Sequence, residues 1–129
     1  MIVLVFCGFK IVETVTSNVY YVAFRPAYSR NLPHDAVRSL ILSLIGIVEV
    51  NLLFATVWLL IGGFCEPIDG MVDAIYFSAV TFQTVGFGEI HPTDDRSKGV
   101  VILMIAVSML MNAVVVARAV GLIVEKRAE

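Results

Sequence analysis

Two long apolar segments, residues 40–64 and residues 100–117, dominate the pattern of hydrophobic and polar positions along this chain. A helix crosses a bilayer with about 20 predominantly apolar residues. Each segment therefore predicts a membrane-spanning helix. Between them, residues 72–83 form a short amphipathic run, which predicts a helix too short to cross.

Capping and turn residues mark the ends of the first long helix. Asp35 is a suitable N-cap, so we expect the helix to start near Ala36. Gly62 and Gly63 suit its end, because glycine readily adopts the left-handed conformation that closes many helices. The single tryptophan, Trp58, is expected near the outer membrane interface, where indole rings gather.

Similar signals bound the other two helices. Asp69 and Gly70 favour a turn before the short helix, which we expect to run to about Gln83. Either Thr93 or Asp94 suits the N-cap of the second long helix, which we expect to run to roughly Val124.

Residues 1–24 form a third apolar stretch, interrupted by Lys10 and Glu13. As one helix they would reach about 36 Å, enough to span a bilayer, and Lys10 and Glu13 would then pair at i, i+3. The alternative is a helix lying along the inner interface. We favour a third, auxiliary membrane helix because the stretch is so apolar.

Composition supports a membrane protein and excludes several other classes. Of 129 residues, 59% are hydrophobic and 16% are charged, and the mean hydropathy is +0.91, whereas a soluble domain of this length needs far more polar surface. No run rich in lysine and arginine indicates nucleic acid. No nucleophile–base pair or set of metal ligands indicates an enzyme. We therefore expect an all-α membrane protein without catalytic activity.

Charge is distributed unevenly around the two long helices. Basic residues lie at the two ends of this region, and acidic residues predominate between the helices. The basic residues are Arg25, Arg30, Arg38, Arg118, Lys126 and Arg127, and the acidic ones are Glu66, Asp69, Asp73, Glu89, Asp94 and Asp95. Since basic residues mark cytoplasmic segments, we expect a multi-pass protein of the plasma (inner) membrane with both ends of this region cytoplasmic. The acidic loop, then outside, would raise the local concentration of cations.

Residues 84–88, directly after the short helix, read Thr-Val-Gly-Phe-Gly. Glycines at alternate positions, Gly86 and Gly88, let the backbone reach positive φ twice within five residues. Such a segment can turn consecutive carbonyl oxygens toward a common axis. Carbonyls in that arrangement can replace the water around a dehydrated cation.

This pentapeptide resembles the selectivity filter of potassium channels, with Phe87 in the tyrosine position, and we refer to residues 84–88 as the filter loop. The order of segments over residues 36–125 resembles the pore domain of two-transmembrane potassium channels. The resemblance implies an outer helix, a re-entrant pore helix with the filter loop, and an inner helix. An N-terminal helix and linker, residues 1–35, would precede this domain, and a short cytoplasmic tail, residues 126–129, would follow it.

The resemblance further implies a passive potassium pore without a cofactor, because the backbone itself holds the permeant ion. K+ would be bound by the carbonyls of Thr84, Val85, Gly86 and Phe87, with the Thr84 hydroxyl closing the innermost site. The Phe87 ring would pack outward against the pore helix. Since one loop cannot surround an ion, we expect a homotetramer with fourfold symmetry, embedded in membrane lipid. The alternatives are a weakly selective cation channel and a non-conducting subunit of a larger membrane complex.

Two positions depart from the family pattern. Gln83 stands where a second threonine is most common, and its longer amide would either bond the loop or alter the inner ion site. Glu89 stands where aspartate is usual. In the family that carboxylate reaches an aromatic donor on the pore helix, which by spacing is Tyr76 here. The alternative is a solvated Glu89 at the pore mouth.

Ser108 and Asn112 are the polar residues of the inner helix and are spaced i, i+4, so they share one face. A polar side chain at mid-membrane is costly unless it faces water or a partner. We therefore expect both to line the cavity below the filter loop, near the gate. The alternative is that Asn112 hydrogen-bonds a neighbouring helix.

Glu49 is an ionisable group well inside the outer helix and needs a partner or a protonated state. Arg118, toward the cytoplasmic end of the inner helix, is the expected partner through its long stem. Lys10 is the second candidate.

His91, three residues beyond the filter loop, is a candidate pH sensor, although exposed loop histidines are commonly inert. Cys7 and Cys65 are expected near opposite membrane faces, so no disulfide between them is predicted.

Overall fold

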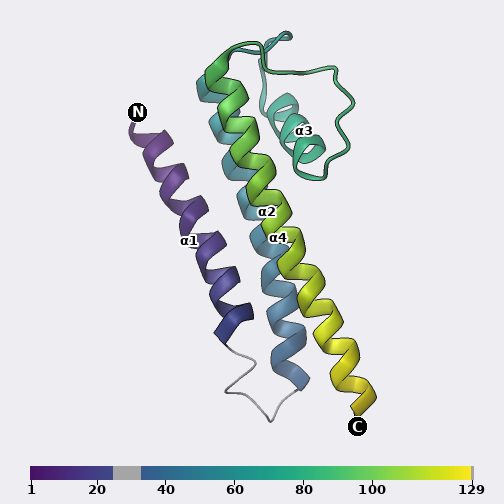
Figure 1. The fold of residues 1–129 in the computed structure, drawn as a ribbon. Helices are drawn as coiled ribbons and strands as arrows, with labels where there is room; N and C mark the ends of the chain where they lie inside the picture. Colours follow the sequence, from purple (N-terminus) through teal and green to yellow (C-terminus); the bar gives the residue numbers. More distant parts are fainter. Residues whose placement is uncertain (25–32, 129) are drawn as a thin grey trace.

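The structure is a computed structural model that describes the backbone of residues 1–24 and 33–128 and the side chains of residues 1–21, 37–121 and 123. Its helices are α1 (Ile2–Phe24), α2 (Pro33–Ile61), α3 (Met71–Phe82) and α4 (Asp95–Ala128). The three long helices lie side by side, and the short α3 packs at the end where α2 finishes and α4 starts (Figure 1). No β-strand occurs in the described residues, so the predicted all-α class is confirmed.

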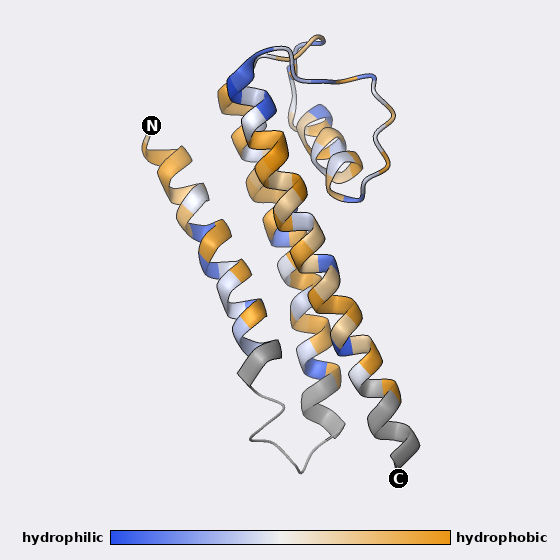
Figure 2. Cartoon of the chain, in the orientation of Figure 1, coloured by the Kyte–Doolittle hydropathy of each residue, from blue (hydrophilic) through white to orange (hydrophobic). Residues whose placement is uncertain are grey.

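Three of the described helices are long and apolar enough to cross a membrane: Ile2–Tyr21 within α1, Val37–Ile61 within α2 and Asp95–Gly121 within α4. Hydrophobic residues cover most of their length (Figure 2). The additional N-terminal helix is therefore present, and it packs along α2 and α4. Lys10 Nζ lies 2.8 Å from Glu13 Oε2, which is the expected i, i+3 ion pair.

Some helix ends and directions differ from expectation. α2 begins at Pro33 rather than near Ala36, because proline suits the first helical position; the side chain of Asp35 lies outside the described residues. α4 continues to Ala128, past Val124, because strong helix formers follow. α1 starts at the same end of the bundle as α3 (Figure 1), so the expectation of Cys7 at the face opposite Cys65 was wrong, although both thiols are free.

An aromatic cluster fixes α3 against α2. The ring centroid of Trp58 lies 6.2 Å from that of Phe54, 5.6 Å from that of Phe64 and 5.3 Å from that of Phe77. Trp58 is fully buried and is thus a core residue near the end of α2. Ser78 Oγ adds a polar link by donating to the Asn51 carbonyl at 2.8 Å.

A close helix contact joins α1 to α2 at Gly46. A Cβ atom built on Gly46 would lie 2.7 Å from Asn18 Nδ2, closer than real side chains approach. Asn18 is held in place because its Nδ2 donates to the Thr14 carbonyl at 2.9 Å. The absence of a side chain at position 46 therefore sets the separation of the two helices.

Candidate functional site

α3 ends in a Schellman motif that leads the chain into the filter loop. Gln83 is the C-cap residue. The Val85 N–H donates to the Val80 carbonyl at 2.9 Å, and the Thr84 N–H donates to the Thr81 carbonyl at 3.1 Å. These two bonds define the motif, whose left-handed position is usually glycine. Here that position is Thr84, with φ of 57°, and positive φ in a β-branched residue is strained.

Positive φ recurs at every second residue of the filter loop. Thr84, Gly86 and Gly88 have φ values of 57°, 59° and 84°, while Val85 and Phe87 keep negative φ. Positive φ at alternate residues is a backbone geometry that can turn successive peptide groups the same way. The prediction of positive φ at the two glycines is confirmed. The positive φ of Thr84 was not predicted, because residue type gives no sign of left-handed backbone at a threonine.

A side-chain hydrogen bond links α3 to the segment after the filter loop. The Tyr76 hydroxyl donates to Glu89 Oε2 at 3.3 Å, which is the contact that the resemblance to potassium channels implies. Desolvation and, next, the charge of Glu89 raise the pKa of the Tyr76 phenol, so the hydroxyl stays protonated and able to donate. Of the two alternatives for Glu89, the structure thus favours the one with an aromatic donor.

The loop stands away from α3 around a cavity of about 180 Å³. Tyr76, Phe77 and Phe87 are among its lining residues. Within one chain, 53% of Val85 and 66% of Phe87 remain exposed. A single chain therefore supplies only part of the packing expected around Phe87, and the Gln83 side chain is exposed as well.

Backbone contacts tie the segment after the filter loop to the end of α2. Phe64 and Pro92 form an isolated antiparallel bridge. The Cys65 N–H donates to the His91 carbonyl at 3.0 Å, and the Thr93 N–H donates to the Gly63 carbonyl at 2.9 Å. These contacts, which we call the outer ladder, hold the filter loop from its C-terminal side.

Asp94 completes this anchorage as the N-cap of α4. The Ser97 N–H donates to Asp94 Oδ1 at 2.9 Å, which selects Asp94 over Thr93 as the cap. Ser97, first through its side chain and then through its N–H, lowers the pKa of the Asp94 carboxyl. Ser97 Oγ also donates to the Gly62 carbonyl at 2.7 Å, so the start of α4 is fastened to the end of α2.

The site is therefore a re-entrant loop with no acid–base or nucleophilic group of its own. Its polar groups are mainly those of the backbone, at the end of a half-length helix, and hydrogen bonds hold the loop on both sides. Residues 46–125 match the protein-family model described as "Ion channel", and this range contains α3, the filter loop and nearly all of α4. The chain belongs to the ion-channel family.

This ion channel also has a curated relative. It is 29% identical over 86 residues to "Two-pore potassium channel 1" of Arabidopsis thaliana, and the match covers 59% of this chain and 24% of the relative. The chain thus spans about a quarter of the length of that relative. No solved structure matches it. Family match and relative together confirm the resemblance to the potassium-channel pore-domain superfamily, in a multi-pass membrane protein.

The polar residues of α4 do not share an open face of this ion channel. Ser108 is fully buried within the single chain and donates through Oγ to the Ile105 carbonyl at 2.8 Å. A side chain enclosed by its own subunit cannot line a cavity between subunits, so the expectation for Ser108 was wrong. Asn112, one turn further, is half-buried at the edge of the same face. The free face of α4 carries apolar side chains such as Ile102 and Met109, which are 68% and 66% exposed.

The expected ion pair between Glu49 and Arg118 is not formed. Arg118 instead joins three helices: its guanidinium donates to the Ser39 carbonyl and the Ser43 hydroxyl of α2, and to the Asn18 carbonyl of α1 at 3.0 Å. The physical reason is register, because Glu49 lies six residues beyond Ser43, or about 9 Å along the helix.

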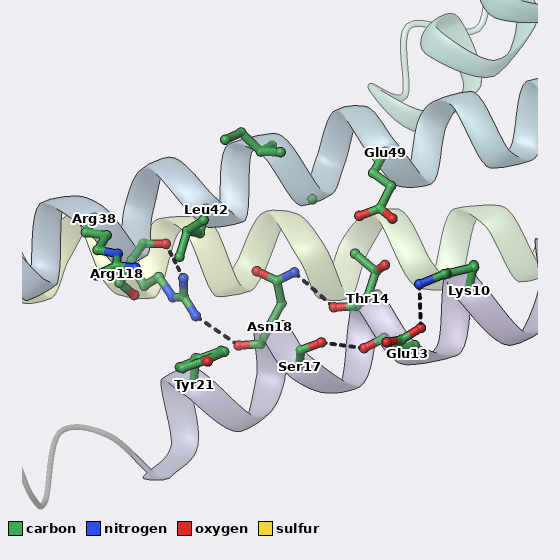
Figure 3. Close-up of a pocket in the computed structure, with 13 residues that line it drawn as sticks. Lys10, Glu13, Thr14, Ser17, Asn18, Tyr21, Arg38, Leu42, Glu49 and Arg118 are labelled. Atoms are coloured by element: carbon green, nitrogen blue, oxygen red, sulfur yellow. Dashed lines mark hydrogen bonds and ion pairs between the residues drawn. The ribbon is translucent and has the colours of Figure 1, made fainter.

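Glu49 lies in a groove of about 400 Å³ between α1 and α2. Its carboxylate faces the side of α1 that carries Thr14 and Lys10 (Figure 3). Lys10, the second candidate partner, forms its ion pair with Glu13. The groove is thus lined mainly by polar and charged side chains of α1 and α2, within helices that are long and apolar enough to cross a membrane.

Proposed function

We propose that the chain is the pore-forming subunit of a potassium-selective channel, which conducts K+ passively as a homotetramer. The observation that carries this proposal is the alternation of positive φ at Thr84, Gly86 and Gly88 in a re-entrant loop. That alternation supports a row of carbonyls, from Thr84 to Phe87, as replacement ligands for the hydration shell of K+. The Thr84 hydroxyl would add the innermost ligand.

The tetramer follows from the geometry of one loop. A single filter loop reaches an ion from one side only, and fourfold repetition of the same contact closes a ring. Val85 and Phe87, 53% and 66% exposed in one chain, are surfaces that neighbouring subunits would cover. The apolar free face of α4 would then line the inner cavity or contact the next subunit.

Two further observations support selectivity and orientation. The curated relative carries the name of a potassium channel. The start of α2 and the end of α4 lie at the end of the bundle opposite the filter loop (Figure 1). With basic residues near that end, we place it in the cytoplasm and the filter loop outside the plasma membrane.

Ion flux from liposomes holding the purified full chain tests the proposal. Flux is measured first with a K+ gradient and then with a Na+ gradient. We expect K+ flux well above Na+ flux, and its loss in Gly86→Ala. Within one chain no atom lies within 4 Å of a Cβ at Gly86, so in the subunit itself this variant acts through φ and not through a clash. Gly99→Ala is the matched control, because it is equally unobstructed but lies in a regular helix.

The other outcomes point to the alternatives. Comparable K+ and Na+ flux would support a weakly selective cation channel, for which Gln83 at the base of the filter loop is the responsible feature. No flux of either ion from a well-folded tetramer, together with obligate co-purification of another membrane protein, would support a non-conducting subunit.

A further inference from the structure

The outer ladder brings together two metal-ligating side chains that are 26 residues apart in sequence. Cys65 Sγ lies 3.1 Å from His91 Nδ1. Both side chains are exposed, and Cys65 is a free thiol. The channel function described above makes no use of either group.

The backbone holds this pair in place. The Cys65 N–H donates to the His91 carbonyl at 3.0 Å, and the adjacent residues form the Phe64–Pro92 bridge. The His91 N–H also points at Cys65 Sγ, at 3.4 Å. The two ligand atoms are therefore fixed close together before any ligand binds, which reduces the ordering cost of binding.

The separation suits one metal ion. With metal–sulfur and metal–nitrogen bonds of about 2.3 and 2.0 Å in tetrahedral geometry, the two ligand atoms of a zinc site lie about 3.5 Å apart. A shift of about half an ångström, within reach of two exposed side chains, converts the observed contact into that geometry. Thiolate and imidazole together favour Zn2+ and similar ions over Mg2+ or Ca2+.

We propose that Cys65 and His91 form a binding site for a thiophilic divalent metal ion, such as Zn2+, on the rim of the filter loop. No cluster of three or more ligating side chains occurs among the described residues, so water completes the coordination and the ion exchanges readily. Binding releases the thiol proton to solvent, because the thiolate is the ligand.

The position of the site gives it a route to the pore. Cys65 Sγ also donates to the Glu89 carbonyl at 3.4 Å, and Glu89 is the acceptor of the Tyr76 hydroxyl. When a metal ion binds the Cys65 thiolate, the thiol proton is lost, and with it the hydrogen bond to the Glu89 carbonyl. Metal binding thereby changes the support of the filter loop, and we expect it to slow K+ flux; this last effect rests on the proposed channel function.

Co2+ is the probe for binding, because a cobalt–thiolate bond gives a charge-transfer absorption in the near ultraviolet. The full chain, kept reduced, is titrated with Co2+ and then with Zn2+. We expect the absorption in the wild type and in Cys7→Ser, and its loss in Cys65→Ser. In His91→Gln the Co2+ Kd should rise by at least about tenfold, since even outer partners of metal ligands contribute that much. Zn2+ should bleach the band and Ca2+ should not.

The same titration can show that Cys65 and His91 do not form a metal site. Absence of the band in the wild type, its persistence in Cys65→Ser, or an unchanged Kd in His91→Gln would show that the contact is only a hydrogen bond between two loop segments. This result is independent of ion conduction, so it is separate from any failure of the proposed function.

The effect on conduction is tested in liposomes, with Zn2+ on both sides because both orientations are present. We expect Zn2+ to slow K+ flux through the wild type and Cys7→Ser but not through Cys65→Ser. Equal inhibition of Cys65→Ser would mean that Zn2+ acts elsewhere. Unchanged flux through a wild type that binds Co2+ would overturn the effect on the pore.

Discussion

The Tyr76 hydroxyl donates to the Glu89 carboxylate at 3.3 Å and so joins the helix before the filter loop to the segment after it. The loop between them surrounds a cavity with α3 and has few other side-chain links to that helix. This hydrogen bond is therefore positioned to hold the loop at a fixed distance from α3.

Tyr76→Phe removes the hydroxyl and keeps the ring. We expect a lower ratio of K+ to Na+ flux and a small loss of stability, because an exposed hydrogen bond contributes little. Glu89→Gln should act in the same direction. A double-mutant cycle, measured by thermal unfolding, gives the decisive result: additive effects of the two substitutions would mean that the bond does not support the loop.

Much of this arrangement was predictable from sequence because it depends on local chemistry. The alternate glycines predicted positive φ at Gly86 and Gly88. The resemblance to potassium channels implied the contact of Glu89 with an aromatic donor, as one of two alternatives, and the spacing pointed to Tyr76 as that donor. The partner of Arg118 was not predictable, because the relative register of two helices depends on packing along their whole length. The burial of Ser108 and the approach of Cys65 to His91 depend on tertiary structure for the same reason.

Thr84 offers a test of the strain in the filter loop. Its φ is 57°, so Thr84→Gly relieves a cost of about 1–2 kcal/mol, which the greater freedom of unfolded glycine partly offsets. We expect this variant to be at least as stable as the wild type but less selective, since the hydroxyl is lost. Gly86→Ala, at φ of 59°, should be destabilised by about 1–2 kcal/mol. Thermal unfolding of both variants checks this asymmetry, and equal destabilisation would contradict it.

The N-cap of α4 predicts a dependence of stability on pH. Hydrogen bonds with Ser97 lower the pKa of Asp94 below its ordinary value of 3.8. The ionised carboxyl therefore contributes stability above that ordinary value, and the contribution is lost as the pH falls through the lower folded-state pKa. Asp94→Asn keeps a good cap but should flatten the acid limb of a plot of unfolding temperature against pH. An unchanged acid limb would show that other carboxyls control it.

The lack of a side chain at Gly46 allows the close approach of α1 to α2, and adding one tests this contact. A Cβ in Gly46→Ala would lie 2.7 Å from Asn18 Nδ2, so Asn18 must give up its bond to Thr14 or α1 must move. We expect faster amide hydrogen exchange in α1 and a loss of stability of about 1–3 kcal/mol. Adding Asn18→Ala should restore part of the loss. Gly8→Ala is the control, because nothing lies within 4 Å of its Cβ; similar exchange in both single variants would argue against the close contact.

The hydrogen bonds of Arg118 join the three long helices, so its replacement tests how much they stabilise the bundle. Arg118→Gln removes hydrogen bonds from a charged donor to α1 and α2, each worth about 1.5–3 kcal/mol, so we expect a clear fall in unfolding temperature and faster exchange in α1. Arg118→Lys should be nearly as damaging, because an ammonium group cannot reproduce the planar fork that reaches three acceptors. Arg96→Gln, at the exposed start of α4, is the control for loss of a positive charge.

A double variant with Glu49→Gln separates the observed contacts from the ion pair that the sequence suggested. Arg118 donates hydrogen bonds to Ser39, Ser43 and Asn18. The losses of stability caused by Arg118→Gln and Glu49→Gln should therefore be additive in the double variant. If the two residues formed an ion pair in the membrane, either single substitution would leave the other charge unpaired, and the double variant would recover stability. Thermal unfolding of the two single variants and the double variant in the same lipid distinguishes the two cases, and we expect additivity.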